Sequence, residues 1–216
     1  MNATSSTADE RPLAVLVDDD AAILEALGEL LDSVGVESMP FSSTGALLAT
    51  NLPDRPACLV LDVRMPGLSG LDLQQHLADR GIDRPIIFLT GHGDIPMSVQ
   101  AMKSGAVDFL TKPVRDQTFL DAVHTAVARD VARREASDKS RRSVALYEAL
   151  TPRERQVLRS VARGALNKQI AFELGISEVT VKLHRSSMMR KMQATSLTRL
   201  LQTWQSLPAG IQSDVR

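Results

Sequence analysis

The residues with the clearest chemical potential are four acids and one lysine, each of which follows a short apolar run. Three consecutive aspartates come directly after the run at 13–17, another aspartate follows the run at 59–61, and the lysine follows the segment 107–111. The strands of a parallel sheet present their carboxyl ends at one edge, where ligands of open α/β sheets bind. We therefore expect these side chains to meet at that edge: Asp18, Asp19, Asp20, Asp62 and Lys112.

Carboxylates gathered in this way repel one another. Two carboxylates about 4 Å apart repel by roughly 4 kcal/mol at an effective dielectric constant near 20. A fold that gathers Asp18, Asp19 and Asp62 therefore either keeps protons on them or binds a hard cation. Carboxylates and a few waters suit Mg²⁺, which usually shares its coordination sphere with a phosphate. For Asp20, capping of the helix that follows is an equally good interpretation.

The apolar runs alternate with helical patterns along the first 128 residues. Four strong runs and one weaker run are expected to be strands, at 13–17, 57–61, 85–90, 107–111 and, more weakly, 36–41. This alternation is typical of a parallel sheet with helices on both faces. Apolar spacing and closing glycines predict three of the helices, between Asp20 and Gly35, between Gly70 and Gly81, and after Asp94 with Val99 and Met102 in its stripe.

A longer helical pattern begins near Arg115 and enters a charged stretch. We interpret residues 129–148 as a linker that is helical at its start and solvated beyond it. The boundaries that follow are a disordered tail at 1–11, an α/β domain at 12–128, this linker, a second domain at 149–207 and a tail at 208–216.

The distribution of charge supports two domains. Residues 1–128 carry 8 Lys and Arg against 18 Asp and Glu, whereas residues 151–216 carry 11 against 4. An acidic domain fits a metal-loaded phosphate site, and a small basic domain fits a polyanion such as DNA. The single cysteine, Cys58, lies in an apolar stretch and is interpreted as a core residue, so disulfides and cysteine-based zinc sites are excluded. No run of about 18 apolar residues and no signal-peptide core is present, which favours the cytosol and no membrane partner.

The second domain has the pattern of a helix-turn-helix. Thr151, Pro152 and Glu154 can form a capping box with proline at the first helical position. A short helix at 167–174 is followed by a glycine turn and by a longer helix from Ser177 to Met192. In the longer helix, the spacing directs one set of residues inward, Val181, Met188 and Met192, and leaves another set on the opposite face, Glu178, Lys182, Arg185 and Met189.

Several longer motifs stand in and around these elements. They are Leu-Val-Asp-Asp-Asp at 16–20, Leu-Asp-Val-Arg-Met-Pro-Gly-Leu-Ser-Gly at 61–70, Thr-Gly-His-Gly-Asp-Ile-Pro-Met at 90–97, Lys-Pro at 112–113 and Asn-Lys-Gln-Ile-Ala at 167–171. Through these motifs the chain resembles a two-component response regulator of the NarL/FixJ family, FixJ-like in character. The resemblance implies a flavodoxin-like (CheY-like) α/β receiver domain of five parallel strands followed by an all-α LuxR-type helix-turn-helix domain.

The resemblance implies a role for each residue of the acidic edge. Asp62 would accept the phosphoryl group, and Mg²⁺ or Mn²⁺ would bind to Asp18, Asp19, Asp62 and the backbone carbonyl of Arg64. Lys112 would offset charge on the transferring oxygens. Thr90 and Phe109 would form the switch pair, although ordinary strand packing is the alternative for both. This chemistry would comprise autocatalysed phosphotransfer and slow self-dephosphorylation rather than the turnover of a substrate by an enzyme.

The resemblance also implies DNA contacts. It places base readers at Lys182, Leu183, Arg185 and Ser186 and backbone contacts at Lys168 and Thr180. Glu178 could accept a hydrogen bond from cytosine N4. The last helix would supply the dimer contact through Leu197, Leu200, Leu201 and Trp204, which implies two half-sites about one helical turn apart.

These observations predict a phosphorylation-controlled transcriptional regulator, and activation is favoured over repression. Its implied partners are a sensor histidine kinase, promoter DNA, RNA polymerase and, when phosphorylated, a second copy of the chain through changes at the fourth helix and fifth strand. Two alternatives stay open. One is a phosphorylation-independent DNA-binding protein whose α/β domain serves only in dimerisation or ligand binding. The other is a metal-dependent phosphohydrolase with an aspartyl-phosphate intermediate.

Overall fold

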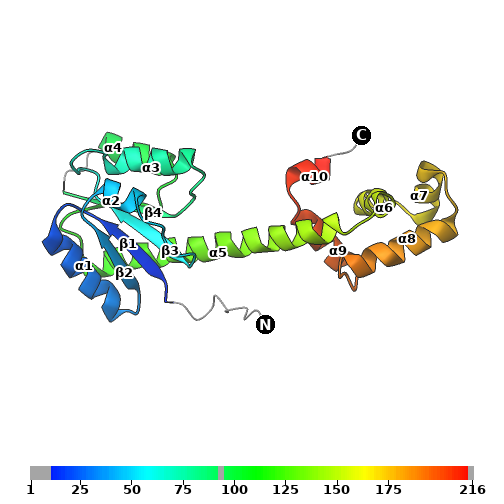
Figure 1. Cartoon of the computed structure of the whole chain (residues 1–216), viewed down its shortest axis with the longest axis horizontal. Coiled ribbons are helices and arrows are strands. Elements are labelled where there is room, and N and C mark those ends of the chain that lie inside the picture. Colours follow the sequence, from blue (N-terminus) through cyan, green and yellow to red (C-terminus); the bar gives the residue numbers. More distant parts are fainter. Residues whose placement is uncertain (1–10, 92–94, 214–216) are drawn as a thin grey trace. The chain divides into compact units, whose positions relative to one another are not determined.

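The computed structural model describes residues 11–91 and 95–213, and the chain divides into two compact units (Figure 1). The N-terminal unit is Met1–Arg133 and the C-terminal unit is Arg134–Arg216. Residues 1–10 of the predicted tail and Asp94, the predicted start of a helix, lie outside the described residues. Within the described ranges, no helix is both long enough and apolar enough to cross a membrane.

The N-terminal unit is built on a five-stranded sheet in which every neighbouring pair is parallel, in the order β2-β1-β3-β4-β5. The strands are β1 (Leu13–Val17), β2 (Glu37–Phe41), β3 (Ala57–Leu61), β4 (Ile86–Thr90) and β5 (Asp108–Thr111). The predicted α/β class is therefore confirmed. β1, β3 and β4 are buried along their whole length, because helices cover both faces of the sheet.

Alternate residues of the central strands pack into two separate cores. One face buries Val15, Leu59 and Phe88 against the helices α2 (Thr44–Leu48), α3 (Gly70–Asp79) and α4 (Ile95–Lys103). The other face buries Leu16 and Ile87 against α1 (Ala21–Ser33) and α5 (Asp116–Glu148). Figure 1 shows these two helical layers on either side of the sheet. The alternation fixes the register, since a slip of one residue would exchange the two faces.

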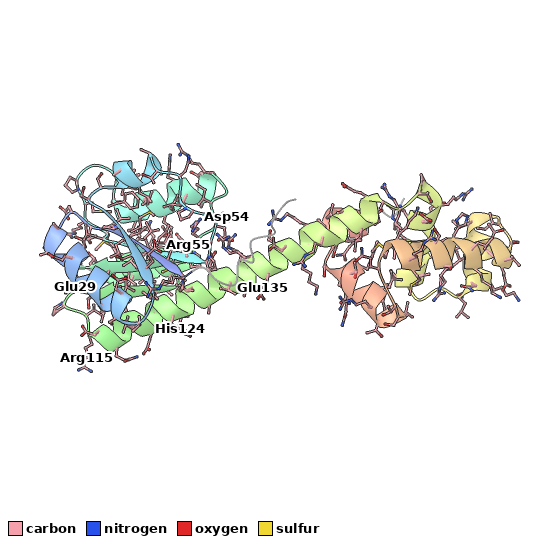
Figure 2. The ribbon with its side chains drawn as sticks, turned by 60° about the horizontal axis from the view of Figure 1, so that its bottom comes forward. Glu29, Asp54, Arg55, Arg115, His124 and Glu135 are labelled. Carbon is pink, nitrogen blue, oxygen red and sulfur yellow. The ribbon has the colours of Figure 1, made fainter. Side chains whose placement is uncertain are left out.

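A buried carboxylate joins α5 to the beginning of β3. The Asp130 side chain is fully buried; it accepts a hydrogen bond from the backbone N–H of Ala57 at 3.0 Å and binds Arg133 at 2.6 Å. Cys58 is a buried core residue, as expected. Burial, together with the negative charge of Asp130, raises the pKa of its thiol to about 12, so the thiol stays protonated. Arg55 lies at this edge, where the strands begin, and Arg115 lies at the other end of the unit (Figure 2).

The segment 129–148 differs from the predicted linker. α5 continues without interruption to Glu148, and its last turns bury Ser143 and Tyr147 in the C-terminal unit. The polar composition of residues 129–148 indicated a solvated segment. The segment is helical to its end instead, because a few buried residues on one side of the helix hold it in place. α4 also differs: it packs through Ala101 and Met97, so the predicted stripe residues Val99 and Met102 are exposed.

The C-terminal unit is a small helical domain around one core. Its remaining helices are α6 (Pro152–Ala162), α7 (Asn167–Leu174), α8 (Glu178–Lys191), α9 (Leu197–Gln205) and α10 (Ala209–Ser213). The predicted capping box is present, with Thr151 as N-cap and Glu154 reaching back to its N–H. Gly175 ends α7 at φ +65°, a left-handed conformation that glycine adopts without strain. α10 lies in the segment predicted as a tail, where Ile211 packs against the core.

Candidate functional site

Three aspartates from two strand ends come together at the carboxyl edge of the sheet. Asp18 and Asp19 follow β1 and Asp62 follows β3, and carboxylate oxygens of all three lie within 4.8 Å of one another. Asp18 and Asp62 are buried and Asp19 is exposed. Asp20 caps α1 instead, because its carboxylate accepts a hydrogen bond from the N–H of Ala22 at 2.9 Å. Three of the four aspartates therefore form a carboxylate cluster, and the fourth, Asp20, is a helix cap.

Lys112 reaches the same cluster from the end of β5. Its Nζ lies 2.5 Å from Asp18 Oδ2 and 3.2 Å from Asp62 Oδ2. Burial disfavours the ammonium charge, but hydrogen bonds and attraction from the two aspartates prevail and raise the pKa of Lys112. One ammonium offsets one of the three carboxylates, so two negative charges stay uncompensated.

The donor set fits a small hard cation. All the donors are oxygens, and the exposed position of Asp19 leaves room for water and for a phosphoryl oxygen. These are the ligands that Mg²⁺ and Mn²⁺ prefer, and Mg²⁺ in particular seldom takes an all-protein cage. At Arg64, the backbone N–H donates to Asp62 Oδ1 at 3.2 Å, which orients the carboxylate.

Thr90 and Phe109 stand on neighbouring strands beside this cluster. Thr90 closes β4 and is 1% exposed, and its carbonyl accepts a hydrogen bond from the N–H of Lys112 at 2.8 Å. Phe109, on β5, is half-buried with its ring centroid 6.0 Å from that of Phe88. Both residues therefore pack as ordinary strand residues. They also lie close enough to the carboxylate cluster for a structural change there to move them.

Gly70 allows α3 to begin against the backbone of Asp62. A Cβ atom built on Gly70 would lie 2.2 Å from the carbonyl oxygen of Asp62 and 3.2 Å from the ring of Phe88. Its N–H donates to the carbonyl of Val63 at 3.1 Å. The motif at 61–70 gave this glycine no specific role, and the close approach is visible only once α3 is folded onto β3.

In the C-terminal unit, α7 and α8 form the predicted helix-turn-helix. α8 buries Val181 and Met188 in the core, as the spacing predicts, and exposes Lys182, Leu183 and Ser186. Lys168 and Glu178 are also exposed. Thr180 is half-buried, and its hydroxyl lies 2.8 Å from that of Ser177 at the start of the helix.

Arg185 does not lie freely on the outer face as its spacing suggested. Its guanidinium donates a hydrogen bond to Asn167 Oδ1 at 3.0 Å and is half-buried, so it joins α8 to the start of α7. Met189 is half-buried as well. The outward stripe of α8 instead contains Val179, which the predicted DNA contacts did not include and which is 67% exposed.

Known proteins match both units. The family model of the response regulator receiver domain matches residues 14–124. The family model of bacterial regulatory proteins, luxR family, matches residues 148–203. The chain is 50% identical over 200 residues to Nodulation protein W of Bradyrhizobium diazoefficiens, covering 93% of this chain and 88% of that protein. It is 41% identical over 196 residues to the transcriptional regulatory protein FixJ of Azorhizobium caulinodans, covering 91% and 92%.

One solved structure covers residues of both units. The structure of the response regulator StyR is 44% identical, with a TM-score of 0.80, and the match covers 91% of this chain and 99% of that one. The chain belongs to the FixJ-like response regulators. It is a transcriptional regulator of the two-component type, with a receiver domain followed by a LuxR-type DNA-binding domain.

Placed in the structure, the residues proposed for the regulator's dimer contact fall into two groups. Leu200 is fully buried in the core of the DNA-binding domain, so it cannot contact a partner without repacking. Trp204 is half-buried against Tyr147, with ring centroids 6.5 Å apart. Leu197 is 46% exposed and Leu201 is half-buried, and these two retain an accessible surface on α9.

A partly buried ion pair holds the end of α8 in this regulator. Glu154 of α6 is 4% exposed and lies 2.7 Å from Lys191 Nζ of α8. Burial favours the protonated acid, but hydrogen bonds from Lys191, Ser187 and Thr151 prevail and lower the pKa of Glu154 to about 2. Because this pKa lies below the unfolded value of 4.5, the stabilisation is complete above about pH 5 and is lost as the pH falls towards 2.

Glu154→Gln is therefore expected to remove a pH-dependent part of the stability of the DNA-binding domain, about 2–3 kcal/mol between pH 5.5 and pH 2.5. The fluorescence of Trp204, the single tryptophan of the chain, reports urea unfolding of this domain. Glu173→Gln is the matched control, since Glu173 makes a surface ion pair with Arg163 at 3.2 Å. Equal loss of stability on acidification in the parent and in Glu154→Gln would contradict this role of Glu154.

Proposed function

We propose that this response regulator accepts a phosphoryl group on Asp62 from a sensor histidine kinase and that the modified protein dimerises and binds promoter DNA. The observation that carries the proposal is the convergence of Asp18, Asp19, Asp62 and Lys112 at one sheet edge. Activation of transcription, with RNA polymerase as a partner at the promoter, is the proposed outcome. The similarity to the transcriptional regulatory protein FixJ supports the regulatory part of the proposal.

The chemistry assigned to the edge is transfer from a phosphohistidine to a carboxylate. A P–O bond forms to Asp62 as the P–N bond to the imidazole breaks, and the bonding electron pair leaves with the imidazole nitrogen. Mg²⁺ or Mn²⁺, held by Asp18, Asp19, Asp62 and the carbonyl of Arg64, would screen the approach of two anions. Lys112 would turn from the aspartates towards the oxygens of the transferring group. Slow hydrolysis of the acyl phosphate follows from the same exposed edge.

The phosphoryl group supplies a local cause for the switch. It brings a charge of about −1.5 to −2 and three acceptor oxygens to an edge that already carries uncompensated charge. The Thr90 hydroxyl is assigned to donate to one of these oxygens, and Phe109 to turn inward as β4 and α4 move. Phosphorylation shifts the population only by stabilising one state more than the other.

The face that such a shift would alter carries exposed apolar residues. On α4, Ile95 is 80% exposed, Val99 45% and Met102 46%. Their i, i+4, i+7 spacing places them on one stripe. An apolar stripe in an exposed position marks an interaction surface. It supports this face as the dimer contact of the phosphorylated receiver domain, with Leu197 and Leu201 as the proposed contact of the DNA-binding domain.

Val99→Lys is expected to weaken dimerisation of the phosphorylated regulator at least tenfold, because it places a strongly hydrated charge in an apolar contact. Analytical ultracentrifugation before and after treatment with acetyl phosphate and Mg²⁺ measures the effect. Val34→Lys is the matched control, since Val34 is an exposed valine (53%) at the end of α1. A dimer constant unchanged by Val99→Lys would contradict the assignment of the α4 face.

The experiment that tests the proposed function is the affinity for DNA before and after phosphorylation. DNA selected from a random pool by the phosphorylated chain is titrated with treated and untreated parent and with Asp62→Asn. The expected result is a rise in affinity of at least tenfold for the parent alone. Equal affinity in all samples would favour the alternative of a phosphorylation-independent DNA-binding protein.

A further inference from the structure

The outward stripe of α8 carries two apolar side chains. Val179, Lys182, Leu183 and Ser186 follow one another at i, i+3, i+4 and i+7, and all four are exposed. Val179 and Leu183 are each 67% exposed. The same helix buries Val181 and Met188 on its opposite side. The apolar pair therefore adds nothing to the core of the domain.

Helix formation does not account for the valine. Valine has a lower helix propensity than alanine, lysine or glutamate, because its branched side chain loses freedom against the preceding turn. An exposed valine in the first turn of α8 thus slightly weakens the helix without packing against the domain. A contact outside the domain would offset this cost.

The charges around the pair favour DNA over a second copy of the chain. Lys182 lies between the two apolar residues on the stripe, and Arg190 is exposed farther along the same helix. Residues 151–216 carry 11 Lys and Arg against 4 Asp and Glu, so two such faces would repel each other. The partner of this stripe should therefore be negatively charged and should also offer apolar groups that Val179 and Leu183 can contact.

The major groove provides one apolar group on its base edges, the 5-methyl group of thymine. We propose that Val179, together with Leu183, recognises thymine methyl groups, so that Val179 is a specificity-determining residue of this regulator. The inference rests on the proposed DNA binding of α8. It adds that the first turn of this helix selects thymine. Lys182, between the two, contacts a neighbouring base or phosphate and sets the register.

Replacement of thymine by deoxyuridine tests this directly, because it removes only the methyl group and keeps base pairing. DNA is selected from a random pool by the full chain treated with acetyl phosphate and Mg²⁺, and each thymine is then replaced singly, in both half-sites. At one or two positions, the parent is expected to lose about three- to fivefold in affinity per half-site. Val179→Ala is expected to lose affinity for the unmodified DNA by a similar factor. At one of these positions, deoxyuridine should then cause no further loss of affinity in this variant.

Val34→Ala is the matched control, because the same atoms are removed from an exposed valine of the receiver domain. It should keep the full sensitivity of the parent. The inference is overturned if the parent tolerates deoxyuridine everywhere, or if Val179→Ala is as sensitive as the parent at every position. If no sequence is enriched in the selection, the proposed DNA binding itself fails, which separates that failure from an error about Val179.

Discussion

Lys112→Met is expected to slow phosphorylation of the regulator by acetyl phosphate at least 100-fold. Methionine keeps nearly the length of the side chain but removes the cation that lies 2.5 Å from Asp18 and 3.2 Å from Asp62. Two anions must approach each other during the transfer, and the loss of one positioned positive group from such a site typically costs about 10²- to 10³-fold in rate. The time course of the intact protein mass measures this rate.

The control for this substitution is Lys103→Met, which removes an exposed lysine in the last turn of α4. It should leave the rate within about twofold of the parent, since an exposed charge away from the edge is screened by salt. A rate for Lys112→Met within threefold of the parent would show that Lys112 serves only as a structural partner of the aspartates.

Gly70→Ala is expected to destabilise the receiver domain by about 2–3 kcal/mol and to slow phosphorylation at least tenfold. The added Cβ would lie 2.2 Å from the carbonyl oxygen of Asp62, a separation that real Cβ atoms do not show. Because that atom belongs to the backbone, the start of α3 or the end of β3 has to move. Hydrogen exchange of the β3 amides measures the stability, and the mass time course measures phosphorylation.

Gly45→Ala provides the matched control within the same domain. A Cβ on Gly45, in α2, would meet only Ser43 Oγ at 4.0 Å, and alanine is favoured over glycine in a helix by about 0.5–1 kcal/mol. This variant should be as stable as the parent or more so. Normal exchange and normal phosphorylation of Gly70→Ala would mean that the contact with Asp62 relaxes without cost.

Much of the receiver fold could be predicted because its central strands are buried on both faces. The runs at 13–17 and 57–61 agree with β1 and β3 at both ends, since each run consists of apolar residues bounded by turn or acidic residues. α2 has five residues, fewer than the two turns over which helical spacing can be recognised. The end of α5 could not be predicted, because its many charged residues indicated a solvated segment. Only a few buried side chains, such as Tyr147, hold this part of the helix.

The candidate sites were predictable where strand order alone brings residues together. Asp18, Asp62 and Lys112 meet because parallel strands end at one edge, and this follows from the sequence. Contacts that depend on how the helices pack did not follow from it. The bond between Arg185 and Asn167 depends on how α7 packs on α8, and the bond between Asp130 and the N–H of Ala57 depends on how α5 crosses the sheet.

The most direct test of the account is the intact mass of the parent and of Asp62→Asn after incubation with acetyl phosphate and Mg²⁺. The account predicts that the parent gains one phosphoryl group and that Asp62→Asn gains none. A gain by both proteins would place the acceptor elsewhere. If neither protein gains mass while a known receiver domain does so in the same donor solution, the account of a phosphorylation switch at this edge is wrong.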